Sequence, residues 1–229
     1  LLKNESLGST TTQHTINDLT PGRLYNVTVV TEAGGLQNSK TIEARTAPSA
    51  VSNITSENNG TSLRLSWQQP EGHVDAFVVT FSNNNTFLQI TTQSGDATEV
   101  EAYQLTPGSA YQVEVMSVSG TLTNQSEITV RTAPAPASFL NLSPSSSGGL
   151  LLTWAPPAGN WESYRVFLFD GLTQLVSTSL DRKTVNFSFP GTLLTPGRRY
   201  RAVVRVESGG LTIDSSCDGS TGWKLTFSY

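Results

Sequence analysis

The sequence predicts an all-β protein made of repeated antiparallel β-sandwiches. A seven-residue turn occurs three times, as LTPGRLY, LTPGSAY and LTPGRRY, and its copies begin at residues 19, 105 and 194. The residues after each turn alternate between apolar and polar, which is the period of a half-buried strand, and helical periodicity appears nowhere. Successive turns lie 86 and 89 residues apart, so each repeat has the length of one small domain.

The repeat sets the domain boundaries. We expect residues 1–47 to be the C-terminal part of a first module, 48–134 a second module, 135–222 a third module and 223–229 a tail with no place in the repeat. The first module begins at a point equivalent to Phe87 of the second, so its first three strands are missing from this sequence. The proline-containing linker RTAPAPA is short and stiff, which favours a rod.

Each complete module has an early strand that carries a tryptophan. LRLSW (63–67) and LLTW (151–154) place Trp67 and Trp154 on the apolar face, and a proline follows each within three residues. Because proline cannot donate to a sheet ladder, the strand has to end there. Ten residues beyond each tryptophan begins another β-rich run, FVVTF from Phe77 and YRVFLF from Tyr164.

The repeated turn is expected to be a corner between two strands. Its tyrosine, which is Tyr25, Tyr111 or Tyr200, can place its ring in the core while its hydroxyl hydrogen-bonds to backbone just upstream. His14 aligns with the strand before the corner. The modules end differently, because ARTAP and VRTAP close the first two whereas the third reads GSTGW.

The asparagines indicate an extracellular chain. Eight of the fourteen begin an N-x-Ser/Thr sequon, whereas roughly four would do so by chance in a chain this rich in serine and threonine. The alternative is a Ser/Thr-rich chain with accidental sequons. The candidate N-glycosylation sites are Asn4, Asn26, Asn53, Asn59, Asn84, Asn124, Asn141 and Asn186. No apolar run approaches the length of a membrane span and no signal peptide opens the chain, so we expect a piece of a larger protein or a processed secreted one.

These motifs carry a family resemblance. The Trp before Pro, the aromatic residue ten positions on, the L-x-P-G-x-x-Y corner and the terminal RTAP together resemble tandem fibronectin type III modules, an immunoglobulin-like sandwich. More narrowly, PGRLYNVTVVTEAGGLQNS, SVSGTLTNQSEITVRTAPAP and VESGGLT are similar to repeats in the ectodomains of R3-class receptor-type protein tyrosine phosphatases.

The resemblance implies a non-catalytic role for this segment. It would be a glycosylated spacer and lateral recognition scaffold on the extracellular side of a single-pass type I plasma-membrane protein. Its expected partners are receptors or adhesion proteins in the same membrane, with an intracellular phosphatase domain outside this sequence. The alternative is an adhesion or matrix protein with the same modules and no attached enzyme. A secreted enzyme would need an active site in the unplaced tail.

Catalytic, cofactor and metal sites are not expected. Phosphate-binding glycine loops, nucleophile elbows and zinc-protease helices are absent from the sequence, and SSCDGSTG lacks the arginine that a tyrosine phosphatase loop needs after its cysteine. His14 and His73 are expected to be structural or exposed. Cys217 aligns with Ile42 and Ile128 and is expected to be buried and inert, or to pair with a cysteine elsewhere.

One face of the third module is the candidate binding site. This module carries the basic excess of a chain whose net charge is −4, and its outward arginines gather on two strands that neighbour each other in the predicted sheet. The candidates are Arg165, Arg198, Arg199, Arg201 and Arg205. Guanidinium groups could hold a sulfated glycosaminoglycan or an acidic protein patch, or they could be ordinary surface residues. Nucleic acid is not expected as a partner at a pI of about 5.2, nor is membrane insertion.

Overall fold

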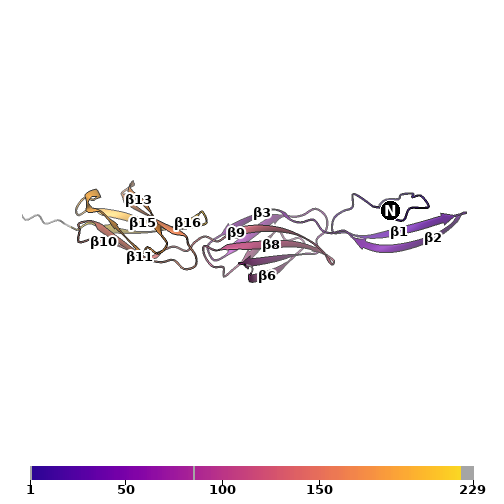
Figure 1. The fold of residues 1–229 in the computed structure, drawn as a ribbon, viewed down its shortest axis with the longest axis horizontal. Coiled ribbons are helices and arrows are strands. Elements are labelled where there is room, and N and C mark those ends of the chain that lie inside the picture. The colour runs from indigo at the N-terminus through magenta and orange to yellow at the C-terminus, as the bar shows by residue number, and fades with distance from the viewer. Residues whose placement is uncertain (1, 85, 223–229) are drawn as a thin grey trace, which may run out of the picture.

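The computed structural model describes residues 2–84 and 86–222. All regular elements in these ranges are β-strands, apart from one 3-10 turn, η1 (Gly191–Leu193). The strands gather in three units that lie end to end, in the order of the chain (Figure 1). All strand pairs are antiparallel. The predicted fold class, a rod of antiparallel β-sandwiches, is confirmed.

Module two is a sandwich of seven strands. They are β3 (Ser52–Asn58), β4 (Leu63–Gln68), β5 (Ala76–Asn83), β6 (Thr86–Ser94), β7 (Glu99–Ala102), β8 (Ala110–Ser119) and β9 (Leu122–Arg131). One sheet has the order β3-β4-β7 and the other the order β6-β5-β8-β9. The chain therefore crosses between the sheets three times, after β4, after β6 and after β7.

Module three repeats this arrangement. Its strands are β10 (Ser138–Pro144), β11 (Leu150–Ala155), β12 (Ser163–Asp170), β13 (Thr173–Asp181), β14 (Asn186–Phe189), β15 (Arg199–Ser208) and β16 (Leu211–Ser220). The sheets have the orders β10-β11-β14 and β13-β12-β15-β16. The last strand, which the divergent sequence GSTGW obscured, pairs with β15 along its whole length.

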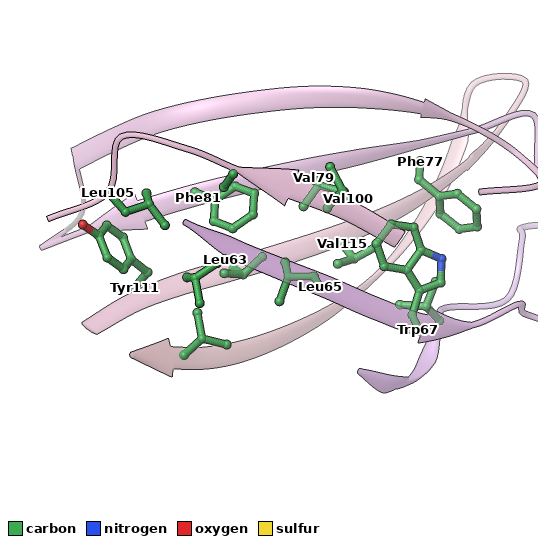
Figure 2. Packing of buried hydrophobic residues seen from close by; sticks show 14 of the residues in the cluster. Leu63, Leu65, Trp67, Phe77, Val79, Phe81, Val100, Leu105, Tyr111 and Val115 are labelled. Carbon is green, nitrogen blue, oxygen red and sulfur yellow. The ribbon is translucent and has the colours of Figure 1, made fainter. Parts of the chain in front are cut away.

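The core of each module lies between its two sheets, and Figure 2 shows it for module two. Trp67 packs edge-on against Phe77, with ring centroids 5.4 Å apart, and Trp154 packs in the same way against Tyr164 at 5.5 Å. Such edge-to-face pairs are favoured by the charge distribution of aromatic rings. The tryptophan strands end at Gln68 and Ala155, just before the prolines that were expected to stop them.

The three tyrosine corners share one geometry. The hydroxyls of Tyr25, Tyr111 and Tyr200 accept hydrogen bonds from backbone N–H groups five residues upstream, at 2.8, 2.8 and 2.7 Å. Tyr111 and Tyr200 are each only 2% exposed. Each corner therefore fixes the entry of a long strand, which is β1 (Leu24–Ala33), β8 or β15, and in modules two and three the tyrosine ring lies in the core.

Module one is an open ribbon in this chain. Its strands β1 and β2 (Leu36–Arg45) form a two-stranded sheet without a facing sheet among the described residues. His14 was placed on a strand before the corner, but no strand is assigned there. In modules two and three the equivalent strands β7 and β14 pair with β4 and β11, and the described residues before β1 include no strand that could play that part.

Candidate protein-binding face

The candidate site is the outer face of the sheet β13-β12-β15-β16 in module three. Arg165 on β12 lies directly opposite Arg205 on β15. Their neighbours Tyr164, Val166, Val204 and Val206 are buried in the core, so alternation directs both arginines outward. Arg201 shares this face, and Arg198 and Arg199 lie where β15 begins. The structure thus places all five predicted arginines around one sheet.

Four of the five guanidinium groups already face a carboxylate. Nitrogen-to-oxygen distances are 3.4 Å for Arg165 and Glu207, 2.8 Å for Arg198 and Asp170, 3.0 Å for Arg199 and Asp218, and 2.8 Å for Arg205 and Asp214. Exposed pairs of this kind contribute little to stability, so they can exchange partners. The face carries both positive and negative groups. Such a mixed face is more complementary to a protein partner than to a uniform polyanion.

Arg205 is held more firmly than the others. It donates two hydrogen bonds to Asp214, at 2.8 and 2.9 Å, and its guanidinium lies over the ring of Phe167 at 5.1 Å. The hydrogen bond from Arg205 is the main reason that the pKa of Asp214 is lowered. The same bond raises the pKa of Arg205. Arg205 therefore fixes the geometry of the face.

Arg201 is the arginine best placed to meet a partner. It is exposed, and its hydrogen bond runs to the hydroxyl of Ser216 at 2.9 Å. Half-buried Phe169 lies opposite Arg201 in the register. It stacks on Phe167 with ring centroids 6.2 Å apart, and Phe167 is only 9% exposed beneath Arg205. Arginine and aromatic side chains are the residues most enriched at the centres of protein interfaces.

The sequons leave this face uncovered. All eight candidate asparagines are exposed. In module three Asn141 lies on β10 and Asn186 on β14, both in the opposite sheet. In module one, by contrast, Asn26 occupies the strand position equivalent to Arg201. A glycan there would shield the corresponding face of module one.

Sequence reasoning found the arginines but missed their surroundings. The acidic partners Asp214 and Asp218 lie on β16, the strand whose sequence had diverged from the repeat. The outward aromatic residues could have been read from YRVFLF, since strict alternation puts Phe167 and Phe169 on the same side as Arg165.

The remaining candidates have ordinary structural environments. His14 contacts Glu5, and His73 lies 3.0 Å from Asp75 in the loop after β4. Cys217 is half-buried against the core of module three, and burial raises the pKa of its thiol. Within residues 2–84 and 86–222 no group of acidic, histidine or cysteine side chains could hold a metal ion, and no helix there is long and apolar enough to cross a bilayer. The expected tail at 223–229 lies outside the described residues.

Two sandwiches with tyrosine corners, joined end to end, define a chain of extracellular-type β-modules. Residues 47–131 match the family model of the fibronectin type III domain. This match contains every strand of module two, so the chain contains a fibronectin type III domain. The fold is similar to that of a two-domain fibronectin type III segment from chicken tenascin, with a TM-score of 0.57, 19% identity, and coverage of 75% of this chain and 99% of that one.

Curated relatives fall into two groups. The chain is 28% identical over 214 residues to receptor-type tyrosine-protein phosphatase V of Rattus norvegicus, covering 90% of this chain and 12% of the relative. It is 26% identical over 194 residues to tenascin-R of Homo sapiens, covering 82% and 14%. A 31% identity over 163 residues links it to the human phosphatidylinositol phosphatase PTPRQ, covering 67% and 7%. The chain thus spans only a small part of each of these relatives.

Proposed function

We propose that this chain belongs to the extracellular region of a receptor-type protein tyrosine phosphatase, where it acts as a glycosylated spacer and a lateral recognition scaffold. Its similarity to receptor-type phosphatases covers up to 91% of the chain. Eight exposed sequon asparagines are consistent with a location outside the cell. The parent would be a single-pass type I protein with its catalytic domain in the cytoplasm. Within the R3 class, the repeat residues most resemble the vascular endothelial type.

The observation that supports the recognition role is the arginine-bearing face of module three, on which no sequon of that module lies. It combines exposed Arg201, half-buried Phe169 and a mixture of positive and negative groups. Arginine and aromatic residues are typical anchors of protein interfaces. We propose that this face binds a receptor or adhesion protein in the same membrane, and so brings the phosphatase near its substrates.

A second candidate function is adhesion or matrix assembly without an attached enzyme. Its support is the similarity to tenascin-R, which covers 82% of the chain. The two functions make different predictions for the full-length protein. The receptor phosphatase partitions into the membrane fraction and hydrolyses phosphotyrosine peptides. A matrix protein does neither. Fractionation of cells that express the full-length protein, followed by a phosphatase assay, therefore separates them.

Binding by the arginine face can be tested on the chain as it stands. Glycosylated wild-type chain is compared with Arg201→Glu for binding to the surface of endothelial or epithelial cells and for retention on heparin. We expect Arg201→Glu to reduce cell-surface binding. The matched control is Arg64→Glu, because Arg64 is also an exposed sheet arginine, paired with Glu99 in module two.

The two ligand classes give different results in this experiment. If Arg201→Glu still binds cells less than wild type after heparan sulfate is removed, the result supports a protein partner. Loss of heparin retention together with loss of cell binding after heparinase would instead assign the face to sulfated glycosaminoglycan. Equal binding by wild type, Arg201→Glu and Arg64→Glu would exclude this face as the recognition surface.

A further inference from the structure

The repeated turn does more than place a tyrosine, because it is tied to the end of its own module. The hydroxyls of Thr46, Thr132 and Thr221 each donate a hydrogen bond of 2.7 Å to the carbonyl of the threonine in the turn of the same module. The amides of Gly22 and Gly108 donate to Ala47 and Ala133, just beyond these threonines. Turn and chain exit therefore form one rigid unit at the end of each module.

At the first junction this unit is in contact with module two. The backbone N–H of His73 donates to the carbonyl of Pro21 at 3.0 Å, and the hydroxyl of Ser119 donates to the carbonyl of Gly22 at 2.6 Å. Arg45 then donates to both Gly22, at 3.1 Å, and Ser119, at 2.7 Å. Its guanidinium also lies 3.9 Å from Asp75. The turn carbonyls of module one thus receive donors from module two.

The second junction repeats these contacts with equivalent residues. The N–H of Asn160 donates to Pro107 at 2.9 Å, and the hydroxyl of Ser208 donates to Gly108 at 2.8 Å. Arg131 donates to Gly108 and to Ser208, both at 3.0 Å. It lies 3.6 Å from Glu162, which occupies the place of Asp75. The second junction also has a further hydrogen bond, which the side-chain amide of Asn160 donates to the hydroxyl of Ser109 at 2.8 Å.

The two modules at each junction touch backbone to backbone. A Cβ added to Gly22 would come within 1.8 Å of the carbonyl oxygen of His73, and one added to Gly108 within 1.8 Å of that of Asn160. Both glycines have a positive φ of 69°, which the turn itself requires. Glycine at this position therefore serves the turn and the close approach of the next module at once.

The serine at the centre of each contact is buried. Ser119 and Ser208 are 0% and 1% exposed, although each carries a hydroxyl. A buried hydroxyl without a partner is costly, and here each one both donates to a carbonyl and accepts from an arginine. The arginine side chains cover the glycine that follows each serine, Gly120 or Gly209.

We propose that the LTPG turn and the terminal arginine of one module form a docking surface for the next module, and that this surface fixes consecutive modules in one relative orientation. The partner is the following module of this chain, presented through its Ser-Gly hairpin and through the loop after its tryptophan strand. Both loops begin with the pattern P-x-G-[HN], at Pro70 and at Pro157. In module three Ser220 stands at the position of Arg45 and Arg131, so the docking surface there lacks its arginine.

The first test compares two glycines in the same turn. Gly108 and Gly197 have φ values of 69° and 72°, so Gly108→Ala and Gly197→Ala impose the same local strain. Gly108 faces the next module, at the backbone of Asn160, whereas Gly197 belongs to module three, which no further described module follows. We expect Gly108→Ala to speed amide exchange at Asn160 and to shorten the maximum dimension in small-angle X-ray scattering. Gly197→Ala should change neither, and exchange at His73, in the other junction, is the internal control.

The second test removes side chains from the contact between the docking surface and the next module, without straining the turn. Arg131→Ala and Ser208→Ala are each expected to speed exchange at Asn160 and to broaden the distribution of shapes in scattering, with Arg64→Ala as the matched surface control. The double variant should show little beyond the larger single effect, since both side chains serve one contact. Unchanged exchange at Asn160 and unchanged scattering in both single variants would overturn the proposal, even if Gly108→Ala failed to fold.

Discussion

In each corner, the hydroxyl oxygen of the tyrosine accepts the hydrogen bond that holds the start of the following strand. We expect Tyr111→Phe to destabilise module two by roughly 1–2 kcal/mol, because it leaves the N–H of Thr106 without its acceptor in a part-buried place. Urea unfolding of the chain measures this change. Tyr103→Phe is the control, since Tyr103 is 59% exposed, and an equal loss in both variants would contradict the role assigned to the corner.

The pair of Arg205 and Asp214 makes a residue-scale prediction about pH. The pKa of Asp214 is lowered in the folded chain, so its contribution to stability is fully present above the pKa of an unfolded aspartate, about 4, and is lost as the pH falls through the folded value. Acidification from neutral pH to below 4 should therefore destabilise module three more in wild type than in Asp214→Asn. The effect is small, because the carboxylate is 45% exposed.

That comparison is made by chemical denaturation at both pH values. The signal of module three can be followed through Trp154 and Trp161, and Asp18→Asn provides a control with an exposed acid in module one. An identical loss of stability on acidification in wild type and Asp214→Asn would show that the ion pair contributes nothing to the folded state.

At the scale of elements, most strands follow from the sequence. Leu63, Leu65 and Trp67 alternate and a proline follows, which is sufficient to place β4 and its buried face. The strand expected around His14 did not form, because its prediction rested on alignment with β7 and β14, and a strand also needs a neighbour to pair with. The alternation of apolar and polar residues indicates which face of a strand is buried, but it does not show whether a neighbouring strand is present to pair with it.

The candidate site was predictable only in part for a similar reason. Alternation correctly places Arg165, Arg201 and Arg205 outward. The carboxylates that face Arg199 and Arg205 are Asp218 and Asp214 of β16, and they are brought there by the register between β15 and β16. The junction was missed because its donors come from loops of the next module, and nothing local to LTPG points to them.

The open ribbon of module one gives a prediction at the same scale. Val29 is 62% exposed, whereas its equivalent in β8, Val115, is fully buried. Ile42 is 55% exposed, whereas its equivalent in β9, Ile128, packs against the core of module two. In this 229-residue chain, amides of β1 and β2 should exchange with solvent faster than the paired amides of β8 and β9, since no second sheet covers them. Exchange measured by mass spectrometry tests this, and equal protection of the two hairpins would refute it.

For the whole molecule, the sequons predict a heavily modified surface. Because all eight asparagines are exposed, expression through a mammalian secretory pathway should yield a chain that loses mass on treatment with a glycan-removing enzyme. Asn186→Gln should remove one glycan and leave binding through the arginine face unchanged, since β14 belongs to the opposite sheet. Secreted chain of unmodified mass would contradict the extracellular assignment.

If the docking surfaces fix the modules as proposed, the two ends of the rod are also not equivalent. Each module presents its turn carbonyls to the donors of the next, so the contacts always run from one end of the chain to the other. The arginine face of module three would then keep a set orientation relative to the sequons of module two. Such a rod would present the arginine face in a fixed direction along its whole length.

The tie between chain exit and corner has a mechanical consequence. The backbone leaves module two at Thr132, whose hydroxyl is bound to Thr106 beside the corner, and β9 ends at the same point. Tension along the chain would enter there and pull β9 lengthwise against β8, which holds it by a ladder of ten residue pairs. Many bonds would have to shear together, so this geometry would resist a pulling force at the chain exit.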